Sequence, residues 1–259
     1  MAVYGYPYPS YTWPYQGVDF AGISGMNQQL ANAMFDDGIR FVGRYLYASQ
    51  YPNGKGLSAA EADFYLNAGL SIYLYYEVNT SDALGGYARG QQNGYAALQQ
   101  IIALGIPIDT MVYCCCDTSV TDAQAAGVVM DYLDGFASEV PNYKVGIYGG
   151  QNVMAACYAH DPDKCRIQAG AWGSYEFDPI NLRQWMIAYN GNAKQDGYIQ
   201  IANVQITNGY ATWRGNSVDL CSAPDLSHMW SAGGPQPPTP PGPGPESGKL
   251  PIWMYLKRF

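Results

Sequence analysis

The sequence predicts an α/β fold: a single (β/α)8 barrel of the TIM type with an extended N-terminal arm and a Pro-rich C-terminal tail. Two observations lead to this prediction. Short apolar runs alternate with helical patterns through the middle of the chain, as in repeated strand–helix units. The runs are continuous rather than alternating with polar residues, which is typical of parallel strands covered on both faces.

The expected elements follow one another in regular order. Ser58 stands three residues before Glu61, and Thr121 stands directly before Asp122, so two helical patterns begin at suitable capping residues. Three patterns are followed by a glycine, the residue that best adopts a left-handed helix end: Gly38, Gly69 and Gly105. We expect strands at residues 17–21, 40–47, 71–77, 111–117, 144–150, 167–173, 199–206 and 218–221, and helices at residues 27–37, 58–68, 83–104, 121–138 and 151–159.

An open, doubly wound sheet is the alternative architecture. Its usual dinucleotide ligands need a glycine-rich loop after the first strand. Residues 22–26 (GISGM) do not have that pattern. The barrel is therefore the preferred prediction.

The charge of the chain limits its partners. It has 259 residues and a net charge of −8, which disfavours nucleic acid and anionic membranes. No apolar stretch is long enough to span a bilayer. Residues 1–16 lack the basic start and apolar core of a secretory signal. If the protein works outside the cell, we expect another route to carry it there.

Composition divides the chain into four parts. Residues 1–16 form a Tyr/Pro-rich arm, for which disorder and packing on the barrel or a neighbour both stay open. Residues 17–232 form the barrel, and residues 233–249 (GGPQPPTPPGPGPESGK) form an extended linker. Residues 250–259 (LPIWMYLKRF) are apolar and basic, and such a segment usually needs a partner surface. We expect this tail to dock onto other proteins of an assembly.

The cysteines and histidines do not form a recognisable metal or nucleophile motif. The sequence has no CxxC pair and no Gly-x-Ser-x-Gly, and both His160 and His228 stand alone. We therefore expect no metal and no cofactor. The consecutive cysteines 114–116 are expected to be small buried residues of a strand. Pairing of Cys157 with Cys165 stays open.

Polar residues recur at the ends of the expected strands. In a barrel, the C-terminal strand ends converge on one open face, so these side chains are expected to share a polar pocket. A buried carboxylate without such a reason is costly. The candidate catalytic residues are Asp19, Glu77 and Asp117, and the candidate substrate-binding residues are Arg44, Tyr75, Tyr148, Trp172, Gln205 and Asp219.

Crowded carboxyl groups suit glycoside cleavage. One carboxyl donates a proton to the leaving oxygen, and a second acts as base or nucleophile or stabilises the charged sugar ring. Crowding also separates their pKa values, so that one carboxyl keeps its proton near neutral pH. Aromatic residues nearby could stack on sugar faces. The plainer alternative is that the acids cap helices or form ion pairs with Arg44.

Several stretches carry a family resemblance: GVDFAGISGMNQQLANAMFDDGIRFVGRYLY, LSAAEADFYLNAGLSIYLYYE, CCCDTSVTDAQAAGVVMDYLDGF, KVGIYGG, NVQITNG and SVDLC. Together they resemble the glycoside-hydrolase-like domains of actinobacteria and their phages, a family similar to the Chalaropsis-type lysozymes that cleave peptidoglycan. The resemblance implies a (β/α) barrel. It matches Asp19 and Asp117 to acids of the first and fourth strands, and Gln205 and Asp219 to the last two strands. Glu77 stands where a residue of the site is expected.

The fourth strand departs from the lysozyme pattern. Chalaropsis-type lysozymes carry an Asp-x-Glu pair there. In this chain the residues are Cys115, Cys116, Asp117, Thr118 and Ser119. One acid of the pair is therefore missing, and Glu77 could supply it from the neighbouring strand.

Two hypotheses of function follow. The first is an enzyme that hydrolyses peptidoglycan or another cell-wall glycan, with Glu77 and Asp117 as the reacting pair and Asp19 tuning them. The second is a non-catalytic glycan-binding module on a virion, for example a minor tail protein of an actinobacterial phage. It would be tethered through residues 250–259. A phage lysin released at the end of infection is a variant of the first.

Overall fold

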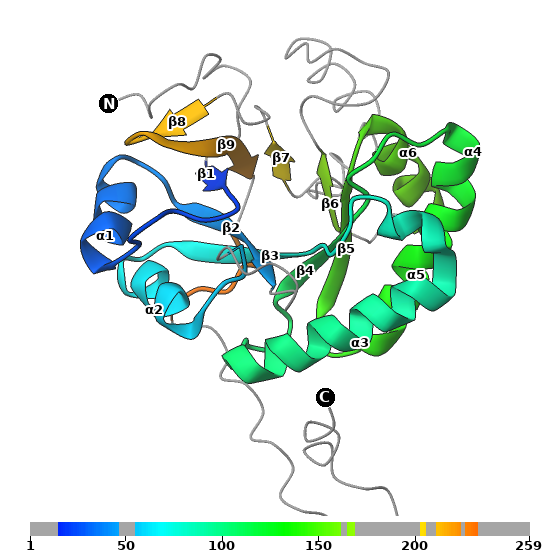
Figure 1. The fold of residues 1–259 in the computed structure, drawn as a ribbon, viewed down its shortest axis with the longest axis horizontal. Coiled ribbons are helices and arrows are strands. Elements are labelled where there is room, and N and C mark those ends of the chain that lie inside the picture. Colours follow the sequence, from blue (N-terminus) through cyan, green and yellow to red (C-terminus); the bar gives the residue numbers. More distant parts are fainter. Residues whose placement is uncertain are drawn as a thin grey trace, which may run out of the picture.

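The computed structural model describes residues 15–46, 55–161, 165–168, 203–205, 211–223 and 226–232. They form a mixed α/β fold in which helices surround a mostly parallel sheet (Figure 1). The strands are β1 (Tyr15–Asp19), β2 (Phe41–Leu46), β3 (Ser71–Tyr76), β4 (Met111–Cys115), β5 (Lys144–Gly149), β6 (Cys165–Gln168), β7 (Asn203–Gln205), β8 (Ala211–Trp213) and β9 (Asn216–Ala223). The helices are α1 (Gln28–Asp36), α2 (Ala59–Asn67), η2 (Asp82–Gly85), α3 (Gly86–Leu104), α4 (Asp122–Gln124), η3 (Ala125–Val129), α5 (Met130–Glu139) and α6 (Gln151–His160).

Strands β1 to β7 pair in sequence order, and each pair is parallel. Strand β9 runs antiparallel to both β1 and β7. The prediction of a uniformly parallel sheet is therefore wrong at its last strand. The cause is a hairpin that the sequence analysis missed, in which β8 and β9 are joined through Arg214 and Gly215. Both residues have positive φ, of 48° and 81°, as a tight two-residue hairpin turn requires.

Both faces of the sheet are buried, which explains the continuous apolar strands. In β3, Ile72 and Leu74 pack in the core cluster that includes the helices. Tyr73 and Tyr75 belong to a second cluster on the other, inner face of the sheet. Strand β4 alternates in the same way, and its two cysteines and the following Cys116 are all buried, as the sequence predicts. Because side chains alternate along a strand, every second residue points to the inner face.

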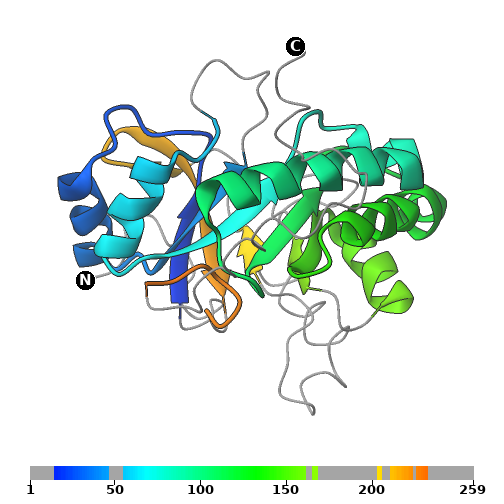
Figure 2. The same ribbon diagram turned by 90° about the horizontal axis from the view of Figure 1, so that it is seen from below.

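The helices lie in two groups around the sheet (Figures 1 and 2). Helices α1 and α2 lie near β1 to β3, and α3, α5 and α6 lie near β4 and β5. Helices α3 and α5 approach each other closely at Gly90 and Gly135. A Cβ atom at either position would collide with a backbone carbonyl of the facing helix. Within the described residues, no helix meets the length and apolarity needed to cross a membrane.

The helix ends largely follow the sequence signals. Gly38, Gly69 and Gly105 have φ values of 94°, 84° and 65°, and so confirm the predicted left-handed ends. The Ser58 side chain accepts a hydrogen bond from the Glu61 backbone at 3.1 Å. The predicted helix over residues 121–138 differs in one respect, because a π-helical turn, η3, interrupts it.

Residues 226–232 close one end of the sheet. Trp230 exchanges two backbone hydrogen bonds of 2.8 Å with Ile72, near the start of β3. Met111, at the start of β4, donates to the His228 carbonyl at 2.7 Å. Leu226 and Met229 pack against the inner cluster. The N-terminal strand ends are therefore covered, whereas the opposite ends carry the acidic residues.

Candidate functional site

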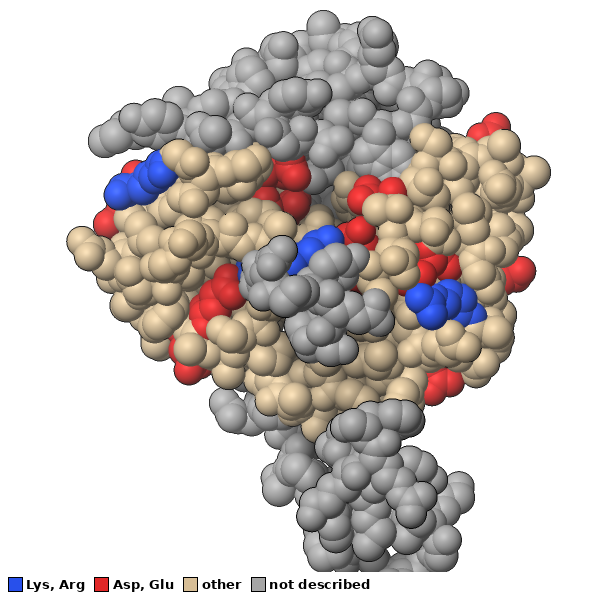
Figure 3. All heavy atoms as spheres, viewed as in Figure 1, with Lys and Arg blue, Asp and Glu red and all other residues tan. Residues whose placement is uncertain are grey.

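The inner face of the sheet ends in carboxyl groups. In β3 the inward residues Tyr73 and Tyr75 are followed, at the same two-residue spacing, by Glu77. In β4 the inward series ends in Cys115 and then Asp117. Because neighbouring strands are parallel, these acids reach the same rim. Acidic atoms, with basic atoms among them, gather near the middle of the face shown in Figure 3.

Asp19 lies at the base of this arrangement and is almost completely buried. Its Oδ2 accepts hydrogen bonds from the Cys221 thiol at 2.9 Å and from the Tyr73 and Tyr75 hydroxyls at 3.4 and 3.5 Å. Burial, and then the nearby charge of Asp219, raise the pKa of Asp19 to about 8. Its carboxyl group is therefore mostly neutral at pH 7.

Asp219 comes to the rim because of the antiparallel last strand. It stands directly opposite Asp19 in the pairing of β1 with β9. Its charge raises the pKa of both Asp19 and Asp117. The sequence therefore predicts this residue's neighbourhood correctly, even though the direction of its strand was expected to be the reverse.

Asp117 and Glu77 face each other across the ends of β3 and β4. Burial, and then the charge of Glu77, raise the pKa of Asp117 to about 7. Glu77 is 7% exposed, and its Oε2 lies 3.1 Å from the Lys55 ammonium nitrogen. Asp117 can thus gain or lose a proton near neutral pH, whereas Glu77 is paired with the Lys55 cation.

Two members of the site were not predicted from the sequence. The Lys55 nitrogen lies 4.0 Å from the centre of the Tyr45 ring as well as beside Glu77. Burial raises the pKa of the Tyr45 hydroxyl, and the charges of Asp19 and Glu77 raise it further. Tyr45 could have been found, because it shares the inward spacing of Phe41 and Gly43. We call the following six residues the rim cluster: Asp19, Tyr45, Lys55, Glu77, Asp117 and Asp219.

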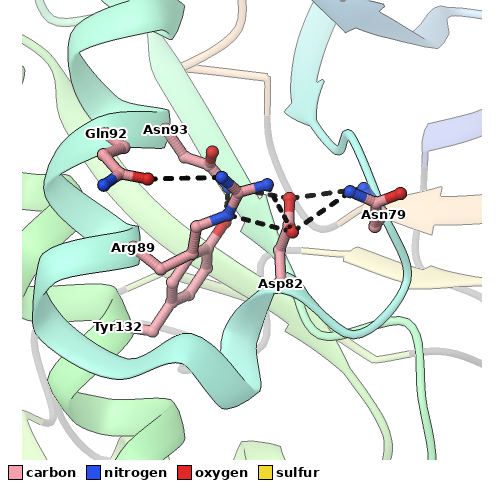
Figure 4. Close-up of polar contacts among 6 residues, drawn as sticks. All are labelled: Asn79, Asp82, Arg89, Gln92, Asn93 and Tyr132. Carbon is pink, nitrogen blue, oxygen red and sulfur yellow. Dashed lines mark hydrogen bonds and ion pairs between the residues drawn. The ribbon is translucent and has the colours of Figure 1, made fainter.

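A hydrogen-bond network around the buried Asp82 carboxylate fixes the turn that follows Glu77 (Figure 4). Asn79 donates to the Asp82 carboxylate from its backbone at 3.3 Å and from its side chain at 3.4 Å. Arg89 of α3 binds the same carboxylate at 2.8 and 3.0 Å. Asn93 bonds to Asp82 at 3.0 Å and to Tyr132 of α5 at 2.9 Å. The carboxylate of Asp82 therefore ties the loop bearing Glu77 to two helices.

Replacing Asp82 by alanine is expected to lower the free energy of unfolding by about 2 kcal/mol, because Asn79, Arg89 and the buried Asn93 lose their shared acceptor. Urea denaturation measures the change. Gln92→Ala is the matched control, since Gln92 is exposed at the edge of the network, and it should change the stability by less than about 0.5 kcal/mol. Equal effects of the two substitutions would contradict the role given to Asp82.

Arg44 does not join the rim cluster. It points to the outer face of the sheet, where its guanidinium group binds Glu61 at 2.7 Å and the carbonyls of Phe20 and Ala21 at 2.7 and 3.1 Å. The alternative in which a rim acid forms an ion pair with Arg44 is therefore wrong, because the guanidinium group pairs with Glu61. Direct contact of Arg44 with a substrate is not compatible with its complete burial.

The predicted aromatic and amide residues of the site lie in different places. Tyr75 and Tyr148 lie in the inner cluster with ring centres 5.4 Å apart, so they form the floor beneath the rim rather than a free stacking surface. Trp172 lies outside the described residues. Gln205 is part of β7, but its side chain lies outside the described set, as does that of Cys165. The roles of Trp172 and Gln205 stay predictions, and the pairing of Cys157 with Cys165 stays open.

Solved structures share this fold. The Tat-secreted protein Rv2525c of Mycobacterium tuberculosis, in complex with L-tartrate, is 19% identical with a TM-score of 0.66, over 84% of this chain and 99% of that chain. Its complex with HEPES gives 20% identity and a TM-score of 0.63 over the same shares. A protein of B. stearothermophilus is 18% identical with a TM-score of 0.56, over 83% of this chain and all of that one. At these identities the likeness concerns the fold alone.

A family model gives the stronger result. Among curated proteins, none matches the chain significantly. The model of the Rv2525c-like, glycoside hydrolase-like domain matches residues 32–221. This match spans most of the chain and includes Glu77, Asp117 and Asp219 of the rim cluster. The chain therefore belongs to the family of Rv2525c-like, glycoside hydrolase-like domains.

Proposed function

We propose that this domain binds and cleaves a glycan of the bacterial cell wall, with peptidoglycan as its substrate. The observation that carries the proposal is the convergence of Asp19, Glu77 and Asp117, from β1, β3 and β4, at the same end of the sheet. Glycoside cleavage needs two carboxyl groups with separated proton affinities. The proposal requires no metal and no cofactor.

Asp117 is the proposed general acid. A carboxyl group with a pKa of about 7 keeps its proton near neutral pH and can pass it to the leaving oxygen. Glu77, beside Lys55, serves as the second carboxylate, which acts as a base or nucleophile or stabilises positive charge on the sugar ring. Asp19 is neutral, lies beneath Glu77 and Asp117, and adjusts their proton affinities. Tyr45 and Asp219 complete the binding surface.

The test is the release of soluble muropeptides from purified cell walls. Asp117→Asn is expected to reduce the rate at least tenfold, because the amide cannot donate the proton, and Glu77→Gln is expected to act similarly. The matched control is Asp131→Asn, at an exposed position of α5, which should leave the rate unchanged. Full activity in both rim variants would refute these roles.

A second candidate is a glycan-binding module that does not turn over its ligand. It is favoured by the buried Cys115, which stands two residues before Asp117, where lysozyme relatives carry an acid. In this case the domain would sediment with insoluble peptidoglycan without releasing fragments. Asp117→Asn would then weaken sedimentation rather than a rate. Absence of both sedimentation and release would exclude cell-wall glycan as the ligand.

The proposed organisation follows the composition of the chain. Residues 17–232 form a closed barrel of the TIM type, which is supported by the pairing of β9 with both β1 and β7. Residues 1–16 are an arm, residues 233–249 a linker, and residues 250–259 a docking tail. We place the protein at the cell-wall surface or on a phage tail, with other virion proteins as partners of residues 250–259. The relative Rv2525c is described as Tat-secreted, which is compatible with work outside the cytoplasm.

A further inference from the structure

The backbone next to Lys55 is held in place by contacts with the end of β2. Its neighbour Gly56 forms a parallel bridge with Tyr45 at the end of β2. The next residue, Leu57, is buried and donates its backbone N–H to the Tyr45 carbonyl at 2.8 Å. These contacts fix the backbone of Gly56 and Leu57 against the end of β2. The lysine side chain, which is 22% exposed, therefore reaches Glu77 from a fixed base.

The ammonium group contacts two other members of the rim cluster. It lies 3.1 Å from the Glu77 carboxylate and 4.0 Å from the centre of the Tyr45 ring. A cation over an aromatic face and beside a carboxylate is stabilised by both. The pair is partly shielded from water, since Glu77 is almost buried. Its charge is therefore felt more strongly by neighbouring groups than that of an exposed lysine.

Negative and titratable groups face this ammonium from several strands. Charges of neighbouring groups raise the pKa of Asp19, Tyr45, Cys115 and Asp117, and the groups that do so include Glu77, Tyr148 and Asp219. Among the described residues that shift these groups, Lys55 is the cation that lowers the pKa of both Asp117 and Cys115. The other described arginines of the neighbourhood bind elsewhere: Arg44 to Glu61 and Arg89 to Asp82. Lys55 thus balances the charge of the rim from within.

We propose that Lys55 is a positioning residue of the rim, which fixes the Glu77 carboxylate, compensates its charge and thereby sets how firmly Asp117 holds its proton. Without this ammonium the repulsion from Glu77 would act on Asp117 undiminished. Asp117 would then bind its proton more tightly and donate it less readily near pH 7. The proposal deepens the function given above and rests on Glu77 and Asp117 forming one site.

The experiment is a pH titration of the full chain labelled with ¹³C at the aspartate carboxyl carbons, in which the Asp117 signal is identified by its loss in Asp117→Asn. In Lys55→Met the midpoint of the Asp117 titration is expected to rise by about one pH unit above that of the unsubstituted protein. Lys55→Gln serves as a second variant if the methionine variant folds poorly. In Glu77→Gln the midpoint is expected to fall, because the carboxylate that raises it is gone.

Two controls separate a local effect from a general one. Lys55→Arg keeps the charge and should keep the midpoint. Lys144→Met removes one positive charge at an exposed position at the start of β5, and it should also leave the midpoint unchanged. An unshifted midpoint in Lys55→Met, or an equal shift in Lys144→Met, would overturn the proposal. Because the titration needs no glycan, its result is independent of muropeptide release, which tests the proposed function.

Discussion

Replacing Arg44 by methionine is expected to lower the free energy of unfolding by about 3–5 kcal/mol. The guanidinium group is completely buried and satisfies Glu61 and the carbonyls of Phe20 and Ala21. Methionine fills most of the volume but leaves the Glu61 carboxylate, which is only 13% exposed, without its cation. Breaking one partner of a buried pair costs far more than the pair contributes. Urea denaturation monitored by tryptophan fluorescence measures the loss.

The double variant Arg44→Met with Glu61→Gln makes this prediction specific. The amide removes the uncompensated charge and can still accept the Tyr65 hydroxyl hydrogen bond, which is 2.7 Å long in the structure. Much of the lost stability should therefore return. Lys144→Met, at an exposed position, should change the stability by less than about 0.5 kcal/mol. If the double variant is as unstable as Arg44→Met alone, lost packing rather than unpaired charge is responsible.

The second large effect concerns pH and Asp19. In the unfolded chain this carboxyl titrates near its ordinary pKa of 3.8, whereas in the fold its pKa is about 8. The folded state therefore binds the proton more tightly. The resulting contribution to stability is complete below pH 4 and is lost as the pH rises towards 8. Its size is on the order of 6 kcal/mol, because each pKa unit corresponds to about 1.4 kcal/mol.

Asp19→Asn is expected to remove the contribution of Asp19 to this pH dependence, because the amide stays neutral at every pH. Denaturant midpoints measured between pH 4 and pH 9 should fall more steeply for the unsubstituted protein than for the variant. The fall that remains in the variant comes from Asp117, whose pKa is raised in the same direction. At pH 9 the variant should be the more stable protein. An unsubstituted protein that gains stability from pH 4 to pH 9 would contradict the protonated state of Asp19.

The strand ends could be predicted because one physical rule governs them. An acid that follows an apolar run in a parallel sheet reaches the rim, and this rule places Asp19, Glu77 and Asp117 correctly. The glycines at helix ends follow a similarly local rule. Such features depend on a few consecutive residues, and the sequence contains those residues directly.

Features that depend on distant parts of the chain were less accessible. Arg44 stands in an apolar run that is buried on both sides, so the sequence does not tell which side it faces. Lys55 meets Glu77 because the next residues, Gly56 and Leu57, pair with Tyr45 at the end of β2. The β8–β9 hairpin was missed because β8 has only three residues, too few for a periodic pattern. In each case the deciding contact joins segments that propensity cannot connect.

The pairing of β1 with β9 has a consequence for how the chain acquires its fold. Tyr15 lies opposite Ala223, so the first strand stays without one of its two neighbours until nearly the whole domain has left the ribosome. Trp230 then adds its hydrogen bonds to Ile72. Contacts between such distant residues carry a large loop-closure cost and form slowly. During synthesis the exposed edge of β1 can pair with the wrong strand. This edge is covered only when β9 pairs with it.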